Sequence, residues 1–163
     1  MLALVVASAC NPSAPPDSQN GAIAMSITPA SGSGDRQVFT ASFNHPGGSQ
    51  QFATVRILFN HAVDGRAGCY VYYQRASSSL LLVNDAGQET TRMPIGSPSH
   101  LANSQCELDG AGSSVRDTGT QLTVRFPVQF KPSFKGKVTV YLFGEETNGQ
   151  STGFKASGSW DLP

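Results

Sequence analysis

Residues 122–130 alternate strictly between apolar and polar side chains, and this period of two constrains the fold more than any other feature of the chain. The apolar members are Leu122, Val124, Phe126, Val128 and Phe130. Five apolar residues at this spacing predict a β-strand with one face on a core and the other toward water. Pro127 falls in the outward-facing set and has no amide hydrogen, so we expect this strand at a sheet edge or at a bulge.

Shorter apolar runs recur along the chain, whereas no helical pattern does. Beyond the first ten residues, clusters of Gly, Pro, Asn or Ser interrupt every window in which a helix of three or four turns could form. The other expected strands cover residues 22–28, 39–43, 54–59, 69–74, 80–83, 105–108, 138–143 and 159–162. About eight or nine short strands predict an all-β fold, a single antiparallel β-sandwich over residues 22–163, with a small barrel as the alternative.

The first 21 residues differ in composition from the rest. Residues 1–10 are a small apolar run, and residues 11–21 read as a linker rich in proline and serine. The apolar run is typical of the end of a secretory signal, with a small-residue cleavage site at residues 7–9. The small residues before Cys10 also make this cysteine a candidate for lipidation of the bacterial lipoprotein kind. Both interpretations lack the positive start of a signal, because no Lys or Arg precedes Arg36.

A third interpretation treats the apolar run as a strand. Leu2, Leu4 and Val6 alternate with the residues between them, so they would share one face of an extended segment. An extended N-terminal arm on a flexible linker is what strand donation to a neighbouring molecule requires. We therefore expect an arm whose three apolar side chains mediate assembly.

Two of the three cysteines, Cys69 and Cys106, fall in expected strands. No Cys-x-x-Cys spacing is present, which argues against a zinc site. In an exported chain the two thiols would oxidise to a disulfide, whereas in a cytosolic chain they would remain buried and reduced. The export-like N-terminus and the low share of charged residues, 13%, favour the disulfide.

Charge excludes several classes of partner. The chain has 11 basic and 11 acidic side chains and no net charge. Nucleic acids and anionic membrane surfaces call for clustered Lys and Arg, so neither is expected. No stretch approaches the about 20 apolar residues of a transmembrane helix, so no membrane span is expected.

The chain resembles a family of uncharacterised β-sandwich repeats in bacterial surface and secreted proteins, which look distantly immunoglobulin-like or fibronectin type III-like. The resemblance runs through most of residues 27–162 and rests on residues 27–34, 69–73, 82–87, 103–106, 130–136 and 158–160. It implies an immunoglobulin-like sandwich, an extracellular location and a non-catalytic scaffold. The family pattern has a cysteine at the positions of both Cys69 and Cys106, and this supports the disulfide.

No catalytic, metal-binding or cofactor-binding pattern is found. His45, His61 and His100 are expected in separate turns or loops, and Asp109 in another turn, so they would not converge. The adjacent Glu145 and Glu146 are expected in a turn, without the opposed geometry of a glycosidase pair. We therefore expect a protein that is not an enzyme.

Tyr70 and Tyr72 form the candidate ligand surface. They share the strand face opposite to Cys69, so they would point away from the core. Exposed tyrosines suit stacking on sugars or contact with a protein. Cross-strand packing on a partly covered sheet is the competing explanation.

These features predict an extracellular or cell-surface structural protein that assembles with copies of itself, head to tail, into a fibre through N-terminal strand donation. The alternative is a lipid-anchored surface module for adhesion or carbohydrate binding. The fate of residues 1–9 separates the two, because a donated arm is retained whereas a signal is removed.

Overall fold

The computed structural model describes residues 22–163, which form two β-sheets and one short 3₁₀ turn. Alternating burial explains the long strands, since every second residue of β11 from Leu122 to Phe130 is buried. The strands are β1 (Ala24–Thr28), β2 (Ser31–Ser33), β3 (Arg36–Asn44), β4 (Phe52–Asn60), β5 (Cys69–Gln74), β6 (Ser79–Val83), β7 (Thr90–Pro94), β8 (His100–Ala102), β9 (Cys106–Asp109), β10 (Ser114–Asp117), β11 (Gln121–Phe130), β12 (Gly136–Glu146) and β13 (Lys155–Leu162).

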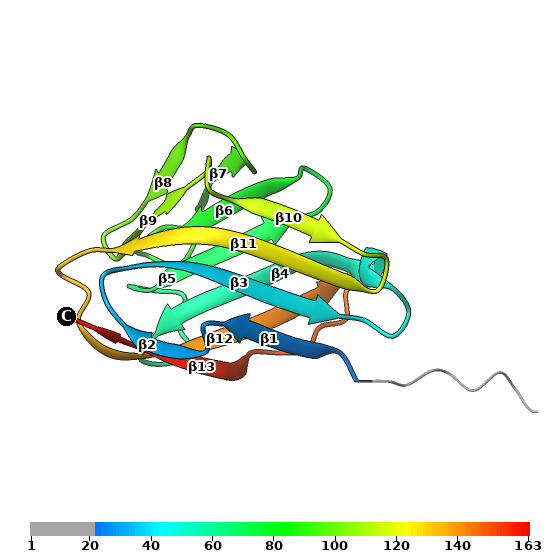
Figure 1. Ribbon diagram of the computed structural model, residues 1–163, viewed down its shortest axis with the longest axis horizontal. Coiled ribbons are helices and arrows are strands. Elements are labelled where there is room, and N and C mark those ends of the chain that lie inside the picture. Colours follow the sequence, from blue (N-terminus) through cyan, green and yellow to red (C-terminus); the bar gives the residue numbers. More distant parts are fainter. Residues whose placement is uncertain (1–21) are drawn as a thin grey trace, which may run out of the picture.

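The two sheets face one another as the layers of a sandwich (Figure 1). The six-stranded sheet has the order β1-β3-β11-β9-β8, with β10 also paired to β11. The seven-stranded sheet has the order β2-β13-β12-β4-β5-β6-β7. Every pairing is antiparallel except that of β2 with β13. The all-β sandwich expected from the sequence is thus confirmed.

The number of strands was underestimated, because the described residues contain thirteen rather than eight or nine. The four strands that were missed are β2, β7, β8 and β10. Each has at most five residues and no more than one fully buried side chain. Such segments have no apolar alternation of their own, so only pairing with a neighbouring strand identifies them.

The core between the sheets is rich in aromatic rings. The Phe39 ring centroid lies 4.8 Å from that of Phe59 and 5.2 Å from that of Trp160. Trp160 is buried, and its indole Nε1–H donates to the Gly34 carbonyl at 2.8 Å. Gly32 lies against this indole, where an added Cβ would come within 2.4 Å of the ring. The single tryptophan therefore fixes β2 and β13 to the core.

Pro127 does not mark an edge strand, contrary to one of the two expectations. β11 is an interior strand that pairs with β3 on one side. On its other side, β10 pairs with residues 122–125 and β9 with residues 128–130. Phe126 and Pro127 fall between these two partners, where the missing amide hydrogen costs the ladder nothing.

The disulfide between Cys69 and Cys106 is confirmed, with Cα atoms 5.6 Å apart. Cys69 lies on β5 and Cys106 on β9, and both residues are fully buried. The bridge thus joins the two sheets through the core. In the part of the chain that the structure describes, no helix is long and apolar enough to cross a membrane.

Candidate functional site

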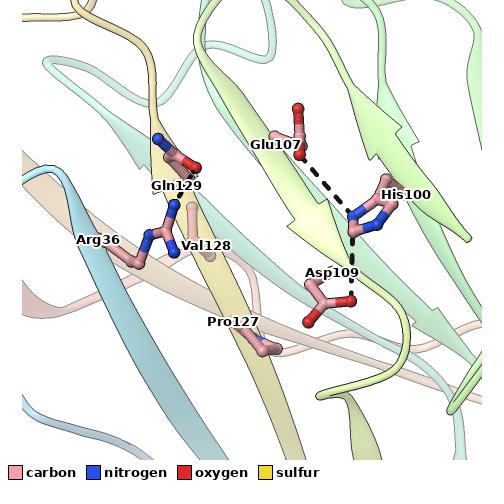
Figure 2. Close-up of a pocket in the computed structure, with 7 residues that line it drawn as sticks. All are labelled: Arg36, His100, Glu107, Asp109, Pro127, Val128 and Gln129. Carbon is pink, nitrogen blue, oxygen red and sulfur yellow. Dashed lines mark hydrogen bonds and ion pairs between the residues drawn. The ribbon is translucent and has the colours of Figure 1, made fainter. Parts of the chain in front are cut away.

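A polar pocket of about 160 Å³ opens on the outer face of the six-stranded sheet. Figure 2 shows its side chains converging from β3, β8, β9 and β11. The residues that line it are Arg36, His100, Glu107, Asp109, Pro127, Val128 and Gln129. These residues come from widely separated parts of the sequence, and we refer to the depression as the polar pocket.

One wall of the polar pocket is a histidine beside two carboxylates. His100 is paired directly with Asp109, and Ala102 with Glu107, so the three polar side chains share the outer face of β8 and β9. His100 Nδ1 lies 3.8 Å from Glu107 Oε1 and 3.9 Å from Asp109 Oδ1. These distances exceed a hydrogen bond, so the imidazole faces both carboxylates without a direct bond to either.

Both carboxylates of this wall keep oxygens free to accept hydrogen bonds. Asp109 Oδ1 accepts from the Ala111 amide at 3.0 Å, whereas among residues 22–163 no donor is bonded to Asp109 Oδ2 or to the Glu107 carboxylate. The expectation that His100 and Asp109 occupy separate turns was wrong. Their strands are short, and they come together only through the pairing of β8 with β9.

The opposite wall is Arg36, held by Gln129. The two residues are cross-strand partners on β3 and β11, and Arg36 Nη2 donates to Gln129 Oε1 at 2.6 Å. A guanidinium has five N–H donors, so most of them remain free to bond a ligand or water. Glu107 is also a cross-strand partner of Gln129, on β9, so one strand separates the carboxylates from the guanidinium.

The floor of the pocket follows from the strand break at Pro127. β9 and β10 meet β11 on either side of this residue. The partly exposed Pro127 ring forms a small apolar base between the polar walls, whereas the Val128 side chain is buried in the core. The arrangement therefore offers acceptors on one side, donors on the other and a small apolar surface between them. The pocket lining contains no Ser, Thr, Cys or Lys nucleophile.

The candidate ligand surface at Tyr70 and Tyr72 lies on the other sheet. Both side chains point to the outer face of β5, away from Cys69, and their ring centroids are 4.7 Å apart. Tyr70 is only 7% exposed, and its ring packs on Phe154 at 5.8 Å. Burial raises the pKa of the Tyr70 hydroxyl well above its ordinary value.

Arg56 extends this packing across β4. Its guanidinium lies 4.5 Å from the Tyr72 ring centroid and 4.7 Å from that of Phe143, and it forms an ion pair with Glu145. We call these residues, with Tyr70, the aromatic face. The Thr54 hydroxyl, followed by Arg56, lowers the pKa of the Glu145 carboxyl below its usual range. Both tyrosines therefore take part in packing within the fold, with Tyr70 buried and Tyr72 partly exposed.

The remaining candidates do not converge. Glu145 and Glu146 lie in β12 and not in a turn, which corrects that expectation, and Glu146 bonds His45 at 2.7 Å. His61 Nδ1 lies 3.1 Å from the Lys137 carbonyl oxygen, far along the sheet from His45. Within residues 22–163, no three His, Cys, Asp or Glu side chains form a group able to hold a metal ion. Cys10, Leu2, Leu4 and Val6 lie outside the described residues.

The polar pocket was missed from the sequence, although one signal was available. Glu107 alternates with Cys106 and Leu108 in the expected strand 105–108, which places its carboxylate on the outer face. Asp109 continues this alternation one residue beyond the expected end of the strand. No pattern in the sequence indicated that Arg36 and His100 would lie near these carboxylates. In the comparisons with known proteins, neither a family model nor a curated protein matches the chain.

Proposed function

We propose that the chain is a non-enzymatic, extracellular structural protein whose immunoglobulin-like sandwich assembles head to tail through N-terminal strand donation. The strand order supports the immunoglobulin-like arrangement. In one sheet β1, β3, β11 and β9 take the order of strands A, B, E and D, and in the other β13, β12, β4, β5 and β6 take the order G, F, C, C′ and C″. The disulfide joins β5 to β9 rather than B to F, so the resemblance is one of topology.

The free edge of β1 is the observation that carries the assembly proposal. β1 ends the six-stranded sheet and is paired on one side only, with β3. Its five residues, Ala24–Thr28, include no charged side chain and no proline. Soluble proteins usually protect an edge with charge, proline or very short strands, so an edge without these features is open to another strand.

The other sheet ends carry such protection. β2 and β8 have three residues each. β7 carries Arg92 and Pro94, and the short β10 carries Arg116 and Asp117. Comparison with every other free edge in residues 22–163 therefore favours β1 as the acceptor.

The donor in this proposal is the apolar run with Leu2, Leu4 and Val6. An incoming strand gains main-chain hydrogen bonds from β1 and places alternate side chains toward the sandwich. Donation from one copy to the next is a heterologous contact, and such contacts propagate as filaments unless the rotation closes a ring. The disulfide supports an oxidising, extracellular setting for the assembly.

The test is electron microscopy of the full chain and of two variants. Each variant adds one lysine to a different edge strand. Ser26→Lys places a charge on β1 and should abolish fibres, whereas Thr90→Lys places the same charge on β7 and should leave them intact. Deleting residues 1–10 should leave a folded monomer without fibres. Fibres that persist in the deletion variant or in Ser26→Lys contradict strand donation to β1.

The alternative function makes a different prediction for the N-terminus of native material. A lipid-anchored module would begin at an acylated Cys10, with residues 1–9 removed. Intact-mass measurement of the native protein separates the two, because only a retained Leu2–Val6 segment can be donated.

A further inference from the structure

We propose that the polar pocket binds one ring of a neutral saccharide. This inference does not depend on how copies of the chain assemble, because the pocket lies on the face of the sheet and not on the free edge of β1. It also differs from the tyrosine surface suggested by the sequence, which is on the other sheet.

The first argument is the division of donors and acceptors. Glu107 and Asp109 can only accept when ionised, and Arg36 can only donate. A ligand that satisfies both walls at once must carry groups that donate and accept, and neighbouring hydroxyls of a sugar ring do both. Gln129 lies between the walls as the cross-strand partner of both Glu107 and Arg36. Its amide can complete either set of hydrogen bonds.

The second argument is the shape and floor. At about 160 Å³ the depression is smaller than the pockets of about 300–1,000 Å³ that enclose drug-sized ligands. It suits a single ring, with the rest of the saccharide lying over the open sheet. The partly exposed Pro127 ring gives the floor a small apolar surface on which the C–H face of a sugar can pack.

The third argument is charge. Two carboxylates repel an anion, and Arg36 disfavours a cation, so a neutral ligand meets neither penalty. All of the charged side chains are substantially exposed, His100 by 57%, so ion pairs with a charged ligand would be weak. The pocket therefore favours hydrogen-bonded recognition of an uncharged polar molecule.

The experiment is an NMR titration of the isotope-labelled full chain with chitobiose, cellobiose, maltose and mannobiose. We expect at least one disaccharide to shift the amide signals of β9 and β11 in a saturable way. Glu107→Gln should weaken that binding by about tenfold or more, because a charge-assisted acceptor is lost. The matched control Glu89→Gln, in an exposed turn, should leave binding unchanged.

Other probes give outcomes that overturn the proposal. Calcium chloride, zinc chloride and glycylglycine should produce no saturable shifts at β9 and β11. Saturation by a metal ion or by the zwitterionic dipeptide, without a response to any disaccharide, would assign the pocket to a charged ligand. The proposal would also be contradicted if disaccharides shifted only the signals of the aromatic face. The same holds if Glu107→Gln bound the disaccharide as tightly as the parent protein. None of these results bears on fibre formation, which the edge variants test separately.

Discussion

The outer faces of the two sheets use their polar groups in opposite ways. On the aromatic face, Arg56 is stacked between Tyr72 and Phe143 and paired with Glu145, so its charge is already satisfied within the fold. In the polar pocket, Glu107 is without a hydrogen-bond donor among the described residues and stands nearly 4 Å from His100. The polar groups of the aromatic face are thus engaged within the fold, whereas the Glu107 carboxylate of the polar pocket is not.

This difference shows that aromatic residues which stand out in a sequence can be engaged by the fold itself. Tyr70 and Tyr72 stand out in the sequence, yet their rings pack on each other and on neighbouring strands. Sites of ligand binding need groups whose interactions are not used up by the fold. The two faces should therefore respond differently to substitution, and the following predictions order these responses by expected size.

The largest effect is expected from removing the disulfide that joins the two sheets. Replacing Cys69 and Cys106 by Ala opens a cross-link that spans 37 positions, which the chain-entropy model values at about 4 kcal/mol. Urea denaturation of the double variant and of the oxidised parent would measure the change in the free energy of unfolding. A difference below about 1 kcal/mol would mean that the disulfide contributes little to holding the sheets together.

A smaller effect should separate the two faces directly. Tyr70→Ala removes a nearly buried ring from the aromatic face and should lower the free energy of unfolding by about 2–3 kcal/mol. Gln129→Ala, an exposed substitution in the polar pocket, should change it by less than about 0.5 kcal/mol. Thermal denaturation of both variants gives the comparison. Equal losses would contradict the division between a stabilising face and a binding face.

The smallest effect is a dependence on pH that belongs to the aromatic face. The pKa of Glu145 is lowered in the folded chain, so its contribution to stability is present above the unfolded pKa of about 4.5 and is lost as the pH falls through the folded value. Glu145→Gln should therefore reduce the loss of melting temperature on acidification. Thr54→Val, which removes the main donor to this carboxylate, should reduce it in part. Identical acid profiles for all three proteins would exclude this contribution.

Local patterns in the sequence determined much of the fold. The alternation in residues 122–130 identified β11 correctly, because a period of two places every second side chain in the core whatever the partner strand is. The two cysteines were expected to pair because of the export-like N-terminus, the low share of charged residues and the family resemblance, and they do. None of these features requires knowledge of strand order.

Only the tertiary structure decided which polar residues meet. Arg36 and Gln129 are 93 positions apart, and their contact depends on the register of β3 against β11. His100 joins Asp109 through a three-residue strand, which has too few side chains for a periodic signal. A shift of one residue in either pairing would move these side chains to the opposite face, so the polar pocket exists because the buried side chains of each strand fix its register.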